Sequence, residues 1–476
     1  MDLISRNIKK RIRGAAVLSI VAVIGACQTT PTTGAGNTGA APVVKTAVKT
    51  APPPSSVAAP APKETVSTPP ASGTSPKPGK LNLTTPQAPV TSPEPEDQVH
   101  RLALLLPLSG RGASIGKALS DAAQMALFET AGDDLEVLVF DTQGTTAGAE
   151  DAARLAIADG ARLILGPLFG ASAEAARPIA TAAGVSIVSF SNNRDIAGDG
   201  VYVFGFLPGQ QVRRIMGFAA TKGHGRVGAL VPSSGFGELV VASARAAAEQ
   251  IGVNVVRATY YDPTDSELSD LISQFADYDS RKSALAAQKS LLSGRTDQIS
   301  KQALARLGGL DTFGDPPFDS VLLPAGDPEL RGIAPLLAYY DVDPARIRLL
   351  GTALWDESRG LGAEPALVGG WYAAASPEAR TDFENKFERA FNRRPPRLAS
   401  LGYDAMLLAV ALTYAENGAD YSSQALTDKN GFAGVDGIFR LLPDGTNQRG
   451  LAVLEVEQDG VRVIDPAPSS FTDFLY

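Results

Sequence analysis

The sequence RLALLLPLSGRGASIG, residues 101–116, opens the part of the chain that decides its fold. It is an apolar run of strand length followed by a loop of small residues, and a helical pattern continues to Thr130. The alternation repeats up to Phe190, with apolar strands at 135–140, 162–165 and 185–190 and helical patterns at 147–159 and 171–183. Near-continuous Val, Ile and Leu strands separated by helices are typical of a parallel sheet covered on both faces. Residues 100–207 are therefore predicted to form a doubly wound α/β lobe.

A second series of the same elements begins at residue 208. The patterns predict strands at 227–231, 254–260, 320–323 and 348–350, which alternate with helices at 237–251, 266–278 and 328–339. Residues 208–370 are therefore predicted to form a second α/β lobe. An insertion at about 280–316 has leucines at helical spacing and basic residues on its other faces. It is either an extra helical hairpin on the surface or an element that docks a partner, and periodicity does not separate these interpretations.

The first 26 residues are predicted to be an export signal. Five basic residues precede an apolar run, 14–24, that is too short to span a bilayer comfortably. The run ends in Ile24-Gly-Ala-Cys27, which is similar to a bacterial lipobox, so Cys27 is predicted to be lipidated and to anchor the chain to a membrane. The alternative is an ordinary signal peptide in which Cys27 merely lies near the cleavage site. Gln28 follows the cysteine where an inner-membrane lipoprotein would carry aspartate, which favours the outer membrane.

Residues 27–99 have the composition of a disordered tether. They hold 15 of the 34 prolines, and Ala, Thr, Ser and Gly fill most of the remaining positions. Such a segment buries too little apolar surface to offset the entropy lost on ordering. A wholly extended tether of this length would reach on the order of 200 Å, at about 3.1 Å per residue. It would serve either to carry the globular part far from its membrane or as a spacer with no required length.

Small polar residues follow three strands of the first lobe. Ser109 comes shortly after the first strand, Ser172 opens the helix after the third, and Ser189 and Ser191 end the fourth. The carboxyl ends of parallel strands are where doubly wound sheets bind ligands, and unpaired N–H groups at helix starts attract carboxylates. The alternative is that these residues only cap helices and form turns, which explains small polar side chains without a ligand.

The segments PLSG (107–110), LGPLFG (165–170) and VSIVSFS (185–191) together resemble the first lobe of type I periplasmic binding proteins. Within that fold, the chain is most similar to the penicillin-binding-protein activator lipoproteins over about 100–460. The resemblance implies a return to lobe one over 371–440, where Gly402-Tyr-Asp-Ala405 resembles a helix that packs on that lobe, and a closing segment at 441–476. It also implies a hinged body with a cleft between two lobes.

A resemblance to the branched-chain amino-acid binders implies which side chains face that cleft. Four serines would face a ligand from lobe one: Ser109, Ser172, Ser189 and Ser191. Phe236 and Trp355 would face it from lobe two, and the Asp356 carboxylate would pair with an ammonium group. Phe236 stands where the binders usually carry tyrosine, so a hydroxyl is lost at that position.

Composition and motif context argue against several other functions. The formal net charge of −8 disfavours nucleic acid as a partner, and one cysteine with two histidines disfavours a disulfide framework or a multi-histidine metal site. Residues 112–116, GASIG, match the nucleophile-elbow pattern, but their serine lies several residues beyond the strand. A dinucleotide fingerprint at 110–116 has its third glycine one position late. We therefore expect no enzyme, no cofactor and no metal.

Two functional hypotheses remain. The resemblance to the activators implies an outer-membrane-anchored periplasmic lipoprotein that binds and activates a bifunctional penicillin-binding protein, which is a peptidoglycan synthase. The tether and the basic insertion suit such a regulator of cell-wall synthesis. The alternative is a periplasmic solute-binding protein that delivers an amino-acid-like ligand to an ABC transporter. A fold alone does not decide between them.

Overall fold

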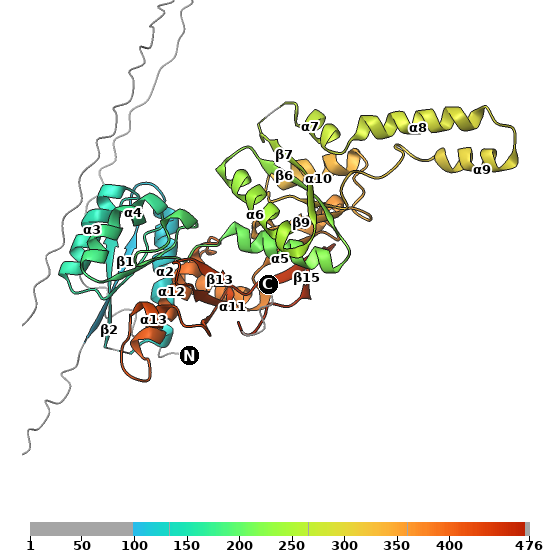
Figure 1. The fold of residues 1–476 in the computed structure, drawn as a ribbon. Helices are drawn as coiled ribbons and strands as arrows, with labels where there is room; N and C mark the ends of the chain where they lie inside the picture. Colours follow the sequence, from blue (N-terminus) through green and yellow to red (C-terminus); the bar gives the residue numbers. More distant parts are fainter. Residues whose placement is uncertain (1–98, 133, 265, 359, 472–476) are drawn as a thin grey trace, which may run out of the picture. The chain divides into compact units, whose positions relative to one another are not determined.

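The computed structural model describes residues 99–471 apart from 133, 265 and 359 (Figure 1). The predicted export signal, the lipidation site Cys27 and all of the predicted tether except residue 99 lie outside the described residues. The described part confirms the prediction of two α/β lobes, each built on a sheet with helices on both faces.

The first sheet consists of five parallel strands in the order β2-β1-β3-β4-β5. These are β1 (His100–Leu106), β2 (Leu135–Asp141), β3 (Leu163–Leu165), β4 (Ser186–Ser189) and β5 (Val201–Val203). Leu102 and Leu104 of β1 pack against one layer of helices, α2 (Ala113–Thr130) and α12 (Ala399–Thr413). Ala103 and Leu105 pack against the other layer, α3 (Thr146–Ala158) and α4 (Gly170–Ala182). Alternation along a strand thus explains why β1 is apolar at every position from Leu102 to Leu106: both faces of this part of the strand are buried.

The second sheet has seven strands in the order β15-β14-β10-β9-β8-β6-β7. Its strands are β6 (Arg226–Pro232), β7 (Asn254–Tyr261), β8 (Ser320–Leu322), β9 (Arg348–Gly351), β10 (Trp371–Ala374), β14 (Ala452–Glu457) and β15 (Gly460–Asp465). One face packs against α5 (Pro208–Thr221) and α6 (Gly235–Ile251), and the other against α7 (Leu268–Phe275) and α10 (Glu329–Tyr339). At one edge of this otherwise parallel sheet, β14 runs antiparallel to β10, and β15 runs antiparallel to β14.

The second sheet corrects one expected boundary. The chain was expected to leave the second lobe at residue 370, but β10 is paired with β9 and β14 and belongs to the second sheet. Its four residues are all buried. The expected closing segment, 441–476, contributes β14 and β15 to the same sheet. The chain therefore crosses back to the first lobe only after Ala374, through α11 (Pro377–Phe391).

Helix α12 ties the C-terminal half of the chain to the first lobe. It is buried on nearly all sides, and Leu401, Tyr403 and Met406 lie in the same apolar core as α2. Around its end lie α13 (Ser423–Leu426) and a small antiparallel sheet of β11 (Phe432–Gly434), β12 (Gly437–Leu441) and β13 (Asn447–Arg449). Short 3₁₀ turns complete the chain: η1 (Arg194–Ile196), η2 (Ala353–Glu357), η3 (Leu361–Ala363) and η4 (Pro365–Leu367).

The insertion forms two helices, α8 (Tyr278–Ser293) and α9 (Gln298–Leu307), which extend away from the second sheet as an arm (Figure 1). Arg281 fixes the base of the arm, because its buried guanidinium group donates hydrogen bonds to Thr312 Oγ1 at 2.7 Å and Asp341 Oδ2 at 2.8 Å. Within the described residues no helix is both long and apolar enough to cross a bilayer.

Candidate functional site

The four predicted serines of the first lobe lie at one edge of the five-stranded sheet, beyond the carboxyl ends of β1, β3 and β4. Ser109 is exposed, whereas Ser172, Ser189 and Ser191 are buried. The parallel register brings these loops to the same edge although the serines span more than eighty positions in the sequence.

Each of these serine hydroxyls already has a partner within its own lobe. Ser172 Oγ donates to the Thr145 carbonyl and Ser189 Oγ to the Pro167 carbonyl, while Ser191 Oγ accepts from the Asn193 N–H. Ser109 Oγ donates to Asp141 Oδ2 at 2.5 Å. Burial opposes ionisation of Asp141, but the hydrogen bonds it accepts from Ser109 and nearby backbone N–H groups keep its pKa below the ordinary value. These bonds build the loops, as the capping interpretation expects; a role in ligand binding stays a prediction.

The three predicted residues of the second lobe lie at the carboxyl edge of the seven-stranded sheet. Phe236 is near the start of α6, just after β6, and is partly buried against the core of that lobe. Trp355 and Asp356 lie in η2, directly after β9. The Trp355 ring has no exposed surface, and its Nε1 donates to the Leu323 carbonyl at 3.0 Å. Trp355 therefore acts as a core residue in this structure, and its contact with a ligand stays a prediction.

Asp356 is paired with a residue that the sequence analysis did not single out. Its carboxylate accepts a hydrogen bond from Arg380 of α11, and only 4% of its side chain is exposed. Burial raises the pKa of Asp356, and the Arg380 and Arg397 guanidinium groups oppose that effect. Because α11 packs on the core of the first lobe through Phe383, the ion pair joins the two lobes.

A cavity of about 450 Å³ opens beside this ion pair. It is called the junction cavity below, because η2 contributes from the second lobe whereas α11 and the start of α12 contribute from the first. Its lining can interact with both positive and negative groups of a ligand, because it includes three arginines and three carboxylates. These are Arg380, Arg394, Arg397, Asp356, Glu357 and Glu384.

Several polar groups that line the junction cavity have no partner, or only a loose one, among the described residues. The Ser358 hydroxyl is buried and has no hydrogen-bond partner among the described residues, and neither does Arg397 Nε. Glu357 is exposed and forms no ion pair with any residue that the structure describes. Arg394 is 63% exposed and lies 3.7 Å from Glu388, which is a loose surface pair. Available groups of both signs fit a ligand that itself carries both charges.

A buried ionic cluster lies behind the cavity, within the first lobe. Arg397 pairs with Asp436 at 2.9 Å, and Arg449 lies 3.6 Å from Asp404 of α12. Burial and the neighbouring Asp436 raise the pKa of Asp404 to about 7, although Arg449 opposes them. The Asp436 pKa is lowered despite burial, because Arg397 and Arg449 lie close to its carboxylate. Arg397 is therefore held rigidly at the wall of the cavity.

Sequence reasoning named Asp356 but missed the other residues of the junction cavity, because the lining comes from three separated segments. The only signal was the run Arg393-Arg-Pro-Pro396, which marks a stiff, charged loop between two helices. Among the residues that the structure describes, no cluster of three or more His, Cys, Asp or Glu side chains could hold a metal ion.

Comparisons with known proteins agree with this architecture. An uncharacterized protein of Rickettsia prowazekii (strain Madrid E) is 29% identical over 128 residues, which cover 26% of this chain and only 33% of that relative. A solved structure from Rhodospirillum rubrum, described as a branched-chain amino acid ABC transporter, has a TM-score of 0.60 at 19% identity and covers 77% of this chain and 100% of its own. A branched chain amino acid ABC transporter periplasmic ligand-binding protein from Burkholderia xenovorans LB400 has a TM-score of 0.57 at 15% identity, with coverages of 78% and 96%.

The family itself is shown by sequence. A family model described as periplasmic binding protein matches residues 100–461, which is well over half of the chain and includes both lobes. The chain therefore belongs to the periplasmic binding protein family.

Proposed function

We propose that this chain is a periplasmic solute-binding protein whose ligand is a small zwitterion of the amino-acid type. The observation that carries the proposal is the junction cavity, which has equal numbers of acidic and basic side chains and lies where η2 of one lobe meets α11 and α12 of the other. Family membership implies the periplasmic location. The similar proteins from Rhodospirillum rubrum and Burkholderia xenovorans carry amino-acid transport in their descriptions, which agrees with a ligand of this class.

The available groups assign the two ends of such a ligand. The ligand carboxylate would bind Arg394 and the unpartnered Ser358 hydroxyl, and the ammonium group would bind Glu357. Asp356 would not take the ammonium, because Arg380 already neutralises it. Lobe closure over the cavity would bring the serine-bearing edge of the first lobe towards the ligand, which keeps Ser109 and Ser191 as proposed contacts.

Exchanging Glu357 for glutamine tests this assignment. We expect Glu357→Gln to weaken binding of L-leucine at least tenfold, because a charge-assisted hydrogen bond contributes about 1.5–3 kcal/mol. Isothermal titration calorimetry would measure the affinity, with 4-methylpentanoate, which lacks the ammonium group, as the paired ligand. Its affinity should not change in the variant.

The matched control is Glu416→Gln, which removes a carboxylate that is exposed outside the cavity. It should leave both affinities unchanged. A panel of neutral, acidic and basic amino acids and dipeptides extends the test to related ligands. If no member of the panel binds the purified chain, the solute-binding proposal is wrong.

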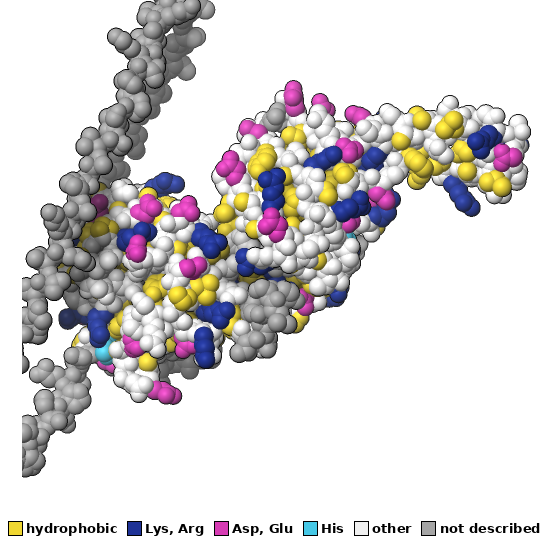
Figure 2. Space-filling view, viewed as in Figure 1, with side chains coloured by type: hydrophobic (Ala, Val, Ile, Leu, Met, Phe, Trp, Pro, Cys, Tyr) yellow, Lys and Arg dark blue, Asp and Glu magenta, His cyan; other side chains and the backbone are white. Residues whose placement is uncertain are grey.

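A second function, activation of a bifunctional peptidoglycan synthase from an outer-membrane lipid anchor on Cys27, is favoured by the arm. Leu291 is 66% exposed and Ile299 is 79% exposed, and both lie near the turn between α8 and α9. The basic residues Lys289, Arg295 and Lys301 flank them, and Figure 2 shows apolar and basic side chains together on the arm. Exposed apolar side chains ringed by polar ones are typical of protein contacts.

Charging the end of the arm separates the two functions. The double variant Leu291→Asp with Ile299→Asp should weaken binding of the periplasmic part of the synthase at least tenfold and abolish its stimulation, because the contact would bury two charges. The readouts are surface plasmon resonance and the rates of glycan polymerisation and crosslinking. Leu155→Asp on α3, which is also exposed, is the control and should have no effect. A synthase whose rates do not respond to the native chain would contradict the activator hypothesis.

A further inference from the structure

A second cavity lies in the second lobe, at the opposite edge of the sheet from Asp356. It has a volume of about 580 Å³ and is called the edge cavity below. Arg348, which lines it, is the first residue of β9, and Trp371 is the first residue of the neighbouring parallel strand β10. Gln458 lies in the turn that ends β14, which runs antiparallel to β10. The cavity is therefore at the amino ends of the parallel strands, whereas ligands of doubly wound sheets bind at the carboxyl ends.

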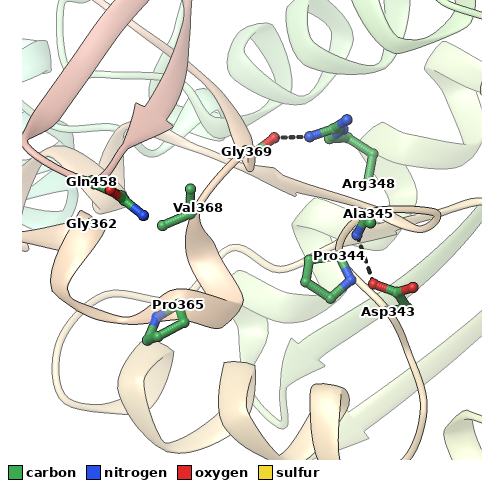
Figure 3. A pocket seen from close by; sticks show the side chains of 9 residues that line it. All are labelled: Asp343, Pro344, Ala345, Arg348, Gly362, Pro365, Val368, Gly369 and Gln458. Atoms are coloured by element: carbon green, nitrogen blue, oxygen red, sulfur yellow. Dashed lines mark hydrogen bonds between the residues drawn. The ribbon is translucent and has the colours of Figure 1, made fainter.

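The Arg348 side chain lines the edge cavity, and its guanidinium group is directed towards Gly369 (Figure 3). Its guanidinium carbon lies 4.5 Å from the centre of the Trp371 ring, and Nη1 donates to the Gly369 carbonyl. Gly369 has a φ of 82°, and a Cβ there would lie 2.8 Å from Arg348 Nη1. The glycine thus allows the guanidinium group to lie flat between the backbone and the indole.

Arg348 has no ion-pair partner among the described residues. Its Nε is buried without a hydrogen-bond acceptor, and desolvation lowers the pKa of the guanidinium group. Glu455, whose carboxylate opposes this lowering of the pKa, accepts a hydrogen bond from Trp371 Nε1 and pairs with Arg462. Asp343 at the cavity wall accepts the Ala345 N–H and pairs with Arg346. A partly desolvated cation without a counter-ion is costly, and an anionic ligand would remove that cost.

The remaining wall limits the rest of the ligand. Four apolar side chains line the cavity, those of Pro344, Ala345, Pro365 and Val368, and the Gln458 amide extends towards Val368 (Figure 3). Asp343 is the one carboxylate among the lining residues, and because it already pairs with Arg346 it is poorly placed to bind an ammonium group. We propose that the edge cavity binds a small monocarboxylate with an apolar body, which Arg348 holds by its carboxylate. This site is separate from the junction cavity and does not require the two lobes to close.

The two tryptophans of the chain report the two cavities separately. Trp371 stacks on Arg348, and Trp355 precedes Asp356 at the junction cavity. In ¹⁵N-labelled protein each indole N–H gives one signal, which Trp371→Phe assigns. The probe is cyclohexanecarboxylate, and the control ligand is cyclohexanecarboxamide, which has the same shape without the charge. We expect the acid to shift the Trp371 signal saturably and the amide to leave it unchanged.

Arg348→Gln should weaken binding of the acid at least tenfold, and Arg348→Lys should retain part of it because the charge remains. Arg154→Gln is the control outside the cavity: Arg154 is 56% exposed on α3 and pairs with Glu150 and Asp151, so the affinity should not change. Three results would each overturn the proposal. They are equal shifts of the Trp371 signal with the acid and the amide, a shift of the Trp355 signal alone, and an unchanged affinity for the acid in a folded Arg348→Gln variant. The two proposals can fail separately. If leucine does not bind at the junction cavity but the acid still shifts the Trp371 signal, the proposed function fails and the edge cavity stands.

Discussion

Replacing Arg449 by methionine is expected to lower the free energy of unfolding by about 3–5 kcal/mol, because the change leaves a buried carboxylate without its cation. The Arg449 side chain is 2% exposed and that of Asp404 is fully buried. Arg449 also donates to the Phe204 carbonyl at 3.0 Å and lies over three aromatic rings, those of Phe204, Phe206 and Phe439. Methionine retains the apolar contacts and removes only the charge and its hydrogen bonds.

The loss of stability in Arg449→Met should be larger at high pH than at low pH. Arg449 opposes the burial that raises the pKa of Asp404, so its removal raises that pKa further. A carboxyl group whose pKa is raised in the folded state favours folding at low pH and loses that contribution as the pH rises towards the raised value. Urea unfolding should therefore show a larger deficit at pH 8 than at pH 5.

Two further variants test this explanation. Asp404→Asn in the Arg449→Met background should recover part of the stability at pH 8, because the amide carries no charge to desolvate. Arg462→Met is the control: Arg462 is 56% exposed and pairs with Glu455 and Glu457 at the surface, so its loss should leave the free energy of unfolding nearly unchanged. A deficit for Arg449→Met that is small, or the same at both pH values, would show that the cluster does not act through charge.

A single methyl group on Gly402 should lower the free energy of unfolding by about 1–3 kcal/mol. A Cβ there would lie 2.3 Å from the Leu119 carbonyl oxygen of α2, which is backbone and cannot move aside alone. Helices α2 and α12 would have to separate, and both contribute to the largest core of the first lobe. Gly402→Ala therefore opposes the usual gain from alanine in a helix.

Gly217→Ala on α5 is the matched control. A Cβ at Gly217 would meet nothing within 4 Å, so this variant should gain up to about 1 kcal/mol from helix propensity. Thermal and urea unfolding of the two variants should thus change in opposite directions. Stabilisation by both would mean that α2 and α12 do not pack as closely as their backbones indicate.

The fold class could be predicted from the sequence because it follows from local pattern. Apolar runs such as 102–106 have no polar face, which requires helices on both sides of the sheet, and this is how Leu104 and Leu105 are buried. The helical spacing of the insertion likewise indicated the helices that became α8 and α9. The candidate ligand residues at strand ends could be placed on the correct edges for the same reason.

Membership of the sheets and pairing of the charges were decided only by the tertiary structure. Strand β10 belongs to the second lobe because it pairs with β14, more than seventy positions later, and no local pattern records that partner. Asp356 appeared free to bind an ammonium group, yet Arg380 neutralises it from another lobe. Arg348 shows the reverse case, a basic residue at a strand start that has no counter-ion among the residues the structure describes. Local pattern determines which faces are buried, whereas the partners of a charge depend on which distant segments the fold brings within a few ångströms.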